Sequence, residues 1–438
     1  DSRFPSDVMD FKGLTRDSID MVYATHWAPD GALNSMGSKY WRPEALEGKP
    51  IRTLNADRSH HDAHIHGALC YAGPKFPMES GTIGLVIDGF GIFGEHFSVY
   101  KFVNGRPTLV RRFRGYDTSL GLWYQYATAF MGLKMHEDEY KLLGYEVHVP
   151  DDISYKLDVK ALERANFLAD RMDKSIYGSS YDPVFAINAL AKVKDMIFSH
   201  LSEVCQEFNI TDSHTTESRA ILAYYVQAVL EKTVLLIVNQ YKPSNLLLSG
   251  GVFYNVKLNK RLIDQVTGKV CVYPLAGDQG NAVGLYAMDH PEFVFPAVLN
   301  WGHRELRYPG HVPNLVVVYE AEALNRVIEL LDQQGVVNLV RGAMEFGPRA
   351  MCNTSTLAIP TMANVHRINH ANERNTVMPM APVMTSAMYH NLFENPGRVW
   401  RSQAHMIVAM EYREHPISSM LGAAHEYHRP YHHHTGRP

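Results

Sequence analysis

Four histidines and one aspartate lie close together in the segment Ser59–His66. If this segment is helical, His60 and His64 are four residues apart on one face and can bind a single divalent metal. His61 then points to another side of the helix, so the metal needs a third ligand from a distant part of the chain. The alternative is a surface group of histidines that only titrates near neutral pH.

Two aspartates in glycine-rich turns are also candidates for chemistry. Asp88 follows an apolar run, 81–87, that is predicted to be a buried strand, and its carboxylate is placed to meet a metal or a nucleophile. Asp278 follows a second strand-like run, 270–274. Because Asp278 comes from a different strand end, it is the natural third ligand of the metal.

Nucleotide-binding turns are predicted at the ends of these strands and of a third one. The run 245–248 predicts another buried strand, and a pair of glycines ends it. Units of strand, glycine turn and helix bring backbone N–H groups to the carboxyl ends of strands, where phosphate binds. The residues assigned to nucleotide binding are Gly89, Gly91, Ser249, Gly250, Gly251, Asn255, Gly277 and Gly280.

The apolar pattern predicts an α/β protein. A hairpin is predicted over 96–113, and helical periodicity dominates 120–143, 183–208 and 218–241. The apolar stretch of the last segment is interrupted by charged residues, which indicates a buried core helix and not a membrane span.

A domain boundary is placed at 291–314, which is rich in proline, glycine and aromatic residues and has no periodicity. Beyond it, strands at 315–319 and 336–340 are predicted to flank a helix at 321–334. The predicted domains are 1–300 and 301–438.

The composition is that of a globular protein with more than one core: 438 residues, 46% hydrophobic, 20% charged, net charge −4. The charge balance excludes avid, sequence-blind binding of nucleic acids, but it leaves room for a nucleotide or a DNA strand in a local groove. The four cysteines form no C-x-x-C pair, which favours a reducing, cytoplasmic setting. No membrane partner is predicted.

Several motifs in a common order make the sequence similar to the O-carbamoyltransferases of nodulation-factor and antibiotic biosynthesis. The segment 341–355 resembles that family's Glu-Phe-Gly-Pro-Arg-Ala-Leu-Gly-Asn-Arg-Ser, and 59–64 resembles its Ser-His-His-x-x-His. Further matches are Ser119-Leu120-Gly121, 139–144, 249–252, 277–280, Arg367-Ile368-Asn369, Arg374 and 379–382.

The resemblance implies an actin-like (ASKHA) metal- and nucleotide-binding domain, related to the universal tRNA threonylcarbamoyl transferase. An α+β YrdC-like domain follows, which we expect to be incomplete at its C-terminus. The family takes carbamoyl phosphate and ATP and forms carbamoyl adenylate in the YrdC-like domain. It then transfers the carbamoyl group to an acceptor hydroxyl in the first domain. The family's N-terminal strand with a His-Asp pair has no counterpart here, so we expect the native protein to extend beyond this sequence.

The same resemblance implies which residues do the chemistry. His60, His64 and Asp278 would hold the divalent metal; iron is preferred, and zinc and manganese are the alternatives, because two imidazoles and a carboxylate suit all three. Asp88 and Lys141 are assigned to catalysis. Lys141 either neutralises phosphate or forms an ion pair with Glu137 or Glu139 at a helix end.

The second domain would bind the polyanions. Arg349, also assigned to catalysis, and Arg374 are the expected anion clamps, because rigid guanidinium groups bind phosphate oxygens bidentately. Asn353 and Ser355 can orient the carbamoyl amide by neutral hydrogen bonds, and Arg367 is assigned to the same site. Thr354 stands where the family has an arginine, as does Ala343, so the clamp differs in detail.

The acceptor is expected to be the hydroxymethyl group of 5-hydroxymethylcytosine in phage-type DNA or a nucleotide. Two basic-aromatic stretches, 39–42 and 111–114, could contact a strand and stack a base, although each is equally well explained as an ordinary loop or hairpin edge. Carbamoylation of an antibiotic or other natural-product sugar is the alternative. A non-catalytic, actin-like nucleotide sensor is the alternative outside enzymes, and a homodimer is left open.

Overall fold

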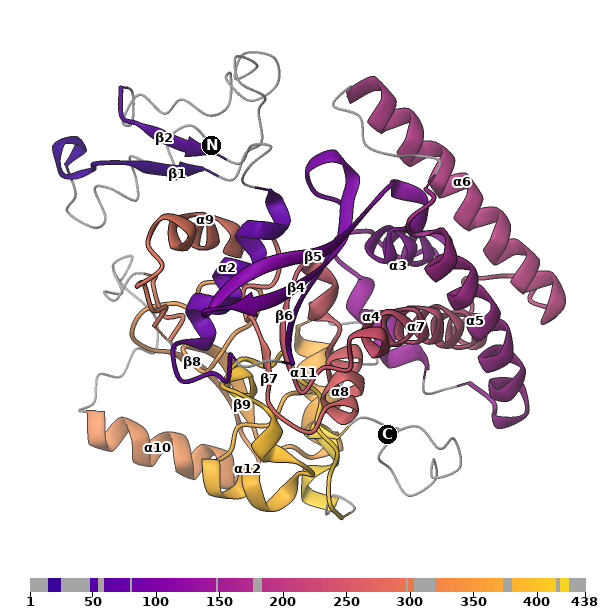
Figure 1. Cartoon of the computed structure of the whole chain (residues 1–438). Helices are drawn as coiled ribbons and strands as arrows, with labels where there is room; N and C mark the ends of the chain where they lie inside the picture. Colours follow the sequence, from indigo (N-terminus) through magenta and orange to yellow (C-terminus); the bar gives the residue numbers. More distant parts are fainter. Residues whose placement is uncertain are drawn as a thin grey trace.

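The computed structural model (Figure 1) describes most of the chain. The described residues are 15–24, 48–53, 59–78, 81–146, 149–175, 183–296, 298–302, 320–372, 380–414 and 418–424.

A five-stranded sheet with the order β5-β4-β3-β6-β7 lies at the centre of the molecule. Its strands are β3 (Thr82–Ile87), β4 (Glu95–Val103), β5 (Arg106–Arg114), β6 (Asn245–Ser249) and β7 (Val270–Val272). β3, β4 and β5 are antiparallel neighbours, whereas β3, β6 and β7 run parallel. The predicted hairpin is confirmed; its turn residues Asn104 and Gly105 have φ of 52° and 74°, the left-handed values that a tight hairpin turn requires.

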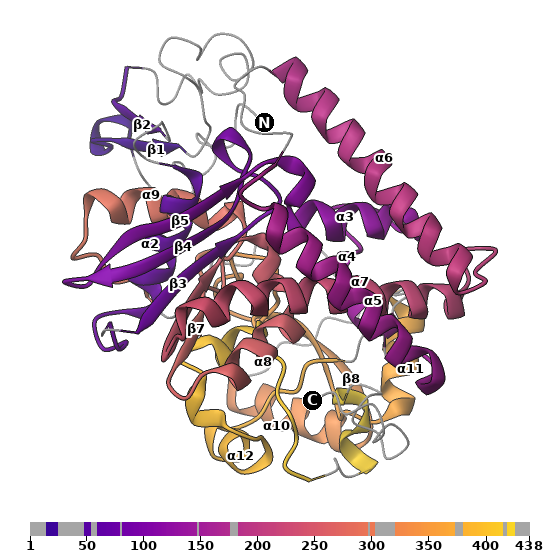
Figure 2. The same ribbon diagram turned by 45° about the vertical axis from the view of Figure 1, so that its right-hand side comes forward.

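The sheet has helices on both faces, so its central strands are buried on both sides (Figures 1 and 2). Leu85 and Ile87 pack into the larger core, together with the side chains of α3 (Leu120–Phe130) and α7 (Thr216–Val238). Val86 points the other way, into a second core beneath α2 (His60–Ala72). This arrangement confirms the α/β class; the actin-like assignment stays a prediction.

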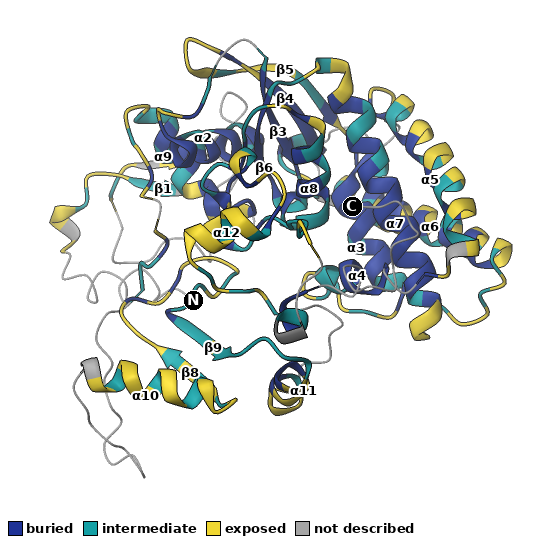
Figure 3. Ribbon diagram, turned by 90° about the horizontal axis from the view of Figure 1, so that it is seen from below, coloured by how far each residue is buried: buried dark blue, intermediate teal, exposed yellow. Residues whose placement is uncertain are grey.

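The face of the sheet that packs into the larger core carries a group of helices. They are α3, α4 (Glu139–Tyr145), α5 (Asp151–Arg171), α6 (Pro183–Glu207) and α7. The segment Thr216–Tyr241 is long and apolar enough to cross a membrane, but 78% of its most apolar window is buried inside the protein. Figure 3 shows α7 enclosed by its neighbours, as predicted for a core helix.

On the opposite face, α2 is held between the sheet and α9 (Asn281–Asp289). The two helices approach so closely that a Cβ atom at Gly284 would lie 1.8 Å from the carbonyl oxygen of Ala63. A Cβ atom at Gly67 would lie 2.9 Å from the ring of Tyr273. These two glycines therefore set how deeply α2 sits on the sheet. α8 (Val256–Gln265) connects β6 to β7.

The C-terminal part gathers on one side of the molecule (orange to yellow in Figures 1 and 2). It contains α10 (Glu320–Asp332), β8 (Val336–Val340), β9 (Thr354–Ala358), α11 (Met362–Ala371) and α12 (Ser386–Leu392), and β8 pairs antiparallel with β9. The predicted strand at 336–340 and the helix after 320 are confirmed, whereas 315–319 lies outside the described residues. A separate two-stranded sheet pairs β1 (Val22–Ala24) with β2 (Ile51–Thr53).

One segment of the C-terminal part returns to the central sheet. Val399 forms a bridge with Val270 of β7, and the backbone N–H of Trp400 donates to the Val270 carbonyl at 2.8 Å. The Oγ of Ser402 also bonds the backbone of Val272. Chain beyond residue 301 thus completes the packing at the β7 edge, while the two predicted domains and the YrdC-like assignment stay predictions.

We predict that Gly284→Ala lowers the free energy of unfolding by about 2–3 kcal/mol, because the added methyl group must push the α2 backbone away. Urea unfolding followed by tryptophan fluorescence measures this. Gly397→Ala is the matched control, since a Cβ atom there meets nothing within 4 Å, and it should change stability by less than about 0.5 kcal/mol. Equal stability of the two variants would contradict the close approach of α2 and α9.

Candidate metal centre

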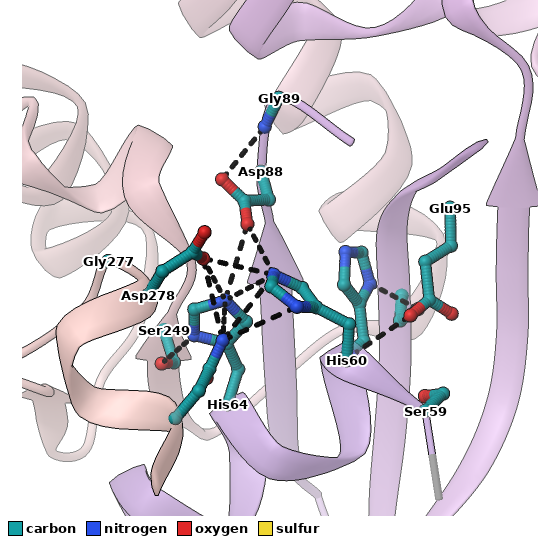
Figure 4. Close-up of polar contacts among 12 residues, drawn as sticks. Ser59, His60, His64, Asp88, Gly89, Glu95, Ser249, Gly277 and Asp278 are labelled. Atoms are coloured by element: carbon teal, nitrogen blue, oxygen red, sulfur yellow. Dashed lines mark hydrogen bonds and ion pairs between the residues drawn. The ribbon is translucent and has the colours of Figure 1, made fainter. Parts of the chain in front are cut away.

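Four side chains from three parts of the chain converge at the carboxyl edge of the sheet (Figure 4). His60 and His64 come from α2, Asp88 directly follows β3, and Asp278 lies in the turn after β7. One ligand atom from each residue lies within 4.8 Å of all the others. The structure thus brings together the three residues predicted to bind metal, and it adds Asp88.

The local sequence explains how each group arrives. α2 begins at His60 because Ser59 caps it: the Ser59 hydroxyl accepts from the backbone N–H of Asp62, whose carboxylate accepts from the N–H of Ser59. The helical spacing then places His60 and His64 on one face. The two aspartates meet them because β3 and β7 are parallel strands of one sheet, so their carboxyl ends lie at the same edge.

The distances within the cluster fit a bound cation. The Nε2 of His60 lies 3.0 Å from both Asp88 Oδ2 and Asp278 Oδ1, and the Nε2 of His64 lies 3.2 Å and 3.6 Å from the same two oxygens. Ligand atoms about 2.1 Å from one metal ion are about 3.0–3.4 Å apart. Three of the four distances lie in this range, and the imidazole and carboxylate donors are of the kind that binds a first-row divalent metal.

The charges within the cluster support the same conclusion. Burial lowers the pKa of His60, but hydrogen bonds with Asp278 and Asp88 outweigh it and raise this pKa from 6.5 to about 10. Burial raises the pKa of Asp88, yet hydrogen bonds with His60 and His64 hold it well below 3.8. The pKa of Asp278 is likewise lowered by these two histidines. Two carboxylates therefore hold a positive charge between them, either a proton on His60 or a metal cation.

Two neighbours orient the ligands from outside the cluster. The Oγ of Ser249, which is fully buried, lies 3.4 Å from the Nδ1 of His64, so this predicted nucleotide-binding residue contacts a metal-binding candidate. Asn281 was not identified from the sequence, although it follows the Asp278 turn directly. Its Nδ2 lies 3.2 Å from the Nε2 of His64 and 3.4 Å from Asp278 Oδ1, while its buried Oδ1 has no hydrogen-bond partner among the described residues.

The predicted nucleotide-binding glycines have packing reasons of their own. A Cβ atom at Gly91 would lie 2.9 Å from His60, and one at Gly251 would lie 2.9 Å from Asp88 Oδ1. These two glycines make room for the cluster. Gly89 is different, because a Cβ atom there meets nothing within 4 Å, although its N–H donates to Asp88 Oδ1 at 2.8 Å and its carbonyl oxygen accepts from the Ser119 hydroxyl.

The remaining glycines of the turns are required by backbone packing. A Cβ atom at Gly250, whose φ is +101°, would lie 2.3 Å from the carbonyl oxygen of Ile87. At Gly280 it would lie 2.1 Å from the oxygen of Leu275, and at Gly277 it would lie 2.6 Å from the side chain of Gln279. Their assignment to nucleotide binding stays a prediction.

The Asn255 side chain serves the fold. Its Oδ1 accepts from the backbone N–H of Leu258 and caps α8, and its amide exchanges two hydrogen bonds with Gln227 of α7. Asn255 is buried, so the structure gives no support to its predicted contact with a nucleotide.

Lys141 has an ion-pair partner at the helix end. Its Nζ lies 2.9 Å from Asp138 Oδ1, so the partner is Asp138 and not Glu137 or Glu139. The pairing explains the residue without a phosphate, and the assignment of Lys141 to catalysis stays a prediction.

In the C-terminal part, Glu345 organises the loop 341–353. This role was not predicted from the sequence. Its Oε1 accepts from the backbone N–H groups of Met351 and Asn353 at 2.7 and 2.6 Å, and its Oε2 accepts from the Thr354 hydroxyl at 2.6 Å. Burial raises the pKa of Glu345, but these hydrogen bonds lower it to about 2. An acidic residue in a Gly-Pro-rich loop was the signal available in the sequence.

Two predicted ligands of the second domain are engaged in this loop. The Nδ2 of Asn353 donates to the carbonyl oxygen of Ala343 at 2.6 Å, and the Ser355 hydroxyl accepts from the N–H of Cys352 at 3.0 Å. Arg367 on α11 donates to Asn364 Oδ1 at 2.8 Å, and Arg374 lies outside the described residues.

Arg349 lies where the loop 341–353 meets the central five-stranded sheet. The loop packs against the turn that carries Asp278: a Cβ atom at Gly347 would lie 2.7 Å from the side chain of Leu275. The buried Nε of Arg349 has no hydrogen-bond partner among the described residues. Burial lowers the pKa of Arg349, and the nearby Tyr254 partly offsets this. Tyr254 in turn accepts from the backbone N–H of Gly277 at 3.1 Å.

The basic stretch 111–114 does not form a nucleic-acid surface of the expected kind. Phe113 is buried in the core, so it cannot stack a base, and the Arg112 side chain is only 11% exposed in contact with two carboxylates. Arg111 forms an ion pair with Asp173. The other stretch, 39–42, lies outside the described residues.

We predict that Glu345→Gln weakens the loop 341–353. The folded-state pKa of Glu345 lies below its ordinary 4.5, so its stabilisation is fully present above about pH 5 and is lost as the pH falls toward 2. At pH 7 the variant should be less stable by about 1–3 kcal/mol in urea unfolding, and the difference should shrink near pH 3.

Glu329→Gln is the control, because Glu329 belongs to an exposed pair with Arg326. It should change stability by less than about 0.5 kcal/mol. A stability loss in Glu345→Gln that is the same at pH 7 and pH 3 would contradict the role of the charge.

Comparison of the amino-acid sequence with known proteins identifies a family. Residues 40–287 match the N-terminal part of carbamoyltransferases, and residues 328–429 match the C-terminal part. The nodulation protein NolO of Bradyrhizobium diazoefficiens is 26% identical over 360 residues, which are 77% of this chain and 60% of NolO. NolNO of Sinorhizobium fredii is 27% identical over 363 residues, 77% of this chain and 48% of that protein.

An uncharacterized protein of Methanocaldococcus jannaschii is 26% identical over 329 residues, 70% of this chain and 58% of its own length. The chain thus spans roughly half to three fifths of these relatives. Because the match to the N-terminal part alone covers more than half of the 438 residues, the chain belongs to the carbamoyltransferase family of enzymes.

Proposed function

We propose that this chain transfers a carbamoyl group from carbamoyl phosphate to an acceptor hydroxyl, with ATP consumed and carbamoyl adenylate as the intermediate. The convergence of His60, His64, Asp88 and Asp278 beside the glycine turns carries the proposal, and membership of the carbamoyltransferase family supports it. The sheet order, a hairpin at one edge and parallel strands at the other, supports an actin-like first domain.

The chemistry requires an activated carbamoyl group. Nitrogen donates into the carbonyl of a carbamate and makes it a weak electrophile, so a good leaving group is needed. In the proposed transfer, the acceptor oxygen forms a bond to the carbamoyl carbon while the bond from that carbon to the phosphate oxygen of AMP breaks. The hydroxyl loses its proton to water, and the products are the carbamate ester and AMP. Formation of the adenylate beforehand consumes one water molecule and releases phosphate from carbamoyl phosphate and pyrophosphate from ATP.

His60, His64, Asp88 and Asp278 would hold the divalent metal, which is iron, zinc or manganese in this proposal. The bound metal would supply a Lewis acid for the adenylate oxygens. The Ser249 hydroxyl contacts the Nδ1 of His64, and the space where a Cβ atom of Gly89 would stand is empty. The His64 side chain is fully buried and that of Asp278 is 74% exposed, so substrate would reach the cluster from the side of Asp278.

Arg349 is proposed to bind the phosphates of the nucleotide. Its position against the turn before Asp278 and its unpaired Nε support this role. Arg374 is proposed as a second clamp on the strength of the resemblance. Formation of the adenylate in a YrdC-like second domain belongs to the same proposal.

The acceptor is a hydroxyl-bearing molecule, and two candidates follow. The hydroxymethyl group of 5-hydroxymethylcytosine is the first, although the burial of Phe113 removes one observation in its favour. A sugar hydroxyl is the second, and it is favoured by the similarity to two proteins named for nodulation.

The decisive experiment incubates the purified chain with a divalent metal, ATP and carbamoyl phosphate, then adds each acceptor in turn. We expect AMP to form only when carbamoyl phosphate is present, and mass spectrometry to show the addition of one carbamoyl group to the acceptor. A chain that binds ATP but releases no AMP would instead be a nucleotide sensor.

We predict that Asp278→Asn lowers carbamoyl transfer about 100-fold or more, because the amide removes a charged ligand from the cluster. Asp195→Asn, an exposed change on α6, is the control and should keep wild-type activity. Wild-type transfer by Asp278→Asn, measured with the same assay, would rule out the cluster as the transfer site.

A further inference from the structure

A buried ionic network lies beneath the first turn of α2, outside the cluster itself. At its centre is the guanidinium of Arg112 on β5, whose side chain is 11% exposed. Its Nη2 lies 2.7 Å from Asp62 Oδ1, and its Nε lies 3.1 Å from Glu95 Oε2. Asp62 belongs to α2 and Glu95 to β4, so the Arg112 guanidinium joins the helix to the sheet.

A β-bulge puts Glu95 in reach of this network. Between Glu95 and Phe97, β4 has an extra residue, so that Glu95 lies opposite Arg114 while Ser98 lies opposite Arg112. Bulges re-aim side chains in this way. The result is that Glu95, which is fully buried, faces the N-terminus of α2 (Figure 4). Arg112 contacts its carboxylate there.

Glu95 and two further residues of β4, Ser98 and Tyr100, also contact α2. Glu95 Oε1 accepts from the backbone N–H of His61 at 3.1 Å, one of the groups that the first helical turn leaves unpaired. The Oγ of Ser98 lies 2.7 Å from His61 Nδ1. The Tyr100 hydroxyl donates to Asp62 Oδ1 at 2.7 Å and accepts from Arg112 Nη2 at 2.9 Å.

These contacts fix the two residues that flank a candidate ligand. His60 lies between the helix cap Ser59 and the anchored His61, and Asp62 closes the capping box. Without the guanidinium, the carboxylates of Glu95 and Asp62 would face each other with no cation between them. Their repulsion would push the first turn of α2 away from β4.

We propose that Arg112 is a positioning residue for the metal centre, because it holds the first turn of α2 at the depth that lets His60 and His64 meet Asp88 and Asp278. The inference rests on the proposed metal site. Arg111, the next residue, provides the contrast: it lies outside this network and forms an ion pair with Asp173.

The test uses Co²⁺ as the probe, because its visible absorption reports both binding and coordination geometry. The full chain is stripped of metal and titrated as wild type, Arg112→Gln, Arg112→Lys and the control Arg111→Gln. We expect Arg112→Gln to weaken Co²⁺ binding at least about tenfold and to change the spectrum of the bound ion. Arg112→Lys keeps the charge but has no fork to reach both carboxylates, so it should recover only part of the loss.

The outcomes separate this inference from the proposed function. If the wild type binds no Co²⁺, the metal site itself is wrong. If the wild type binds and Arg112→Gln matches both wild type and Arg111→Gln in affinity and spectrum, the positioning role of Arg112 is wrong.

A second variant covers the case in which Arg112→Gln does not fold by circular dichroism. Tyr100→Phe removes one hydroxyl from the network and keeps the ring. We expect it to weaken Co²⁺ binding about threefold, and wild-type affinity in this variant would then overturn the inference.

Discussion

The structure depends on keeping two carboxylates and two imidazoles within 4.8 Å of one another, with only the Asp278 side chain largely exposed to water. Asp88 and Asp278 repel each other unless a cation lies between them, and burial makes that repulsion stronger. A proton on His60 can supply the charge, as its pKa of about 10 indicates. A divalent metal would supply more charge and bind all four groups directly.

Close packing of the backbone is what brings these groups together. Gly284 lets α9 touch α2, Gly67 lets α2 rest on Tyr273, and Gly91 lets the loop after β3 pass over His60. At each of these places a methyl group would collide with its neighbour. Gly91, which was assigned to a nucleotide-binding turn, therefore shapes the cluster through packing, whereas a Cβ atom at Gly89 would meet no neighbour within 4 Å.

The C-terminal part contributes to the central five-stranded sheet as well as to its own fold. Its segment at 399–402 extends the β7 edge, and its loop at 341–353 packs against the turn before Asp278. Glu345 gives that loop its shape by accepting three backbone N–H groups. Arg349 is consequently held beside the turn before Asp278, where the proposed chemistry needs a phosphate-binding group.

The sequence by itself determined the features that depend on neighbours along the chain. The spacing of His60 and His64, the cap at Ser59 and the hairpin turn at Asn104-Gly105 are local, and the α/β class follows from apolar periodicity. The convergence of Asp278 with the histidines could be predicted because strand ends in a parallel sheet share an edge. The family could also be identified, because its motifs occur in a fixed order.

Only the tertiary structure decided how the remaining side chains are used. A bulge in β4 shifts the alternation of the strand by one residue, so no pattern could place Glu95 under α2 or bury Arg112 beside it. The amide of Asn255 exchanges two hydrogen bonds with Gln227 of α7, which is 28 residues away in the sequence. Asn281 and Glu345 gained their roles from groups that fold around them. The physical reason is that a hydrogen bond or ion pair is specified by distance in space, and strand register and helix packing set that distance.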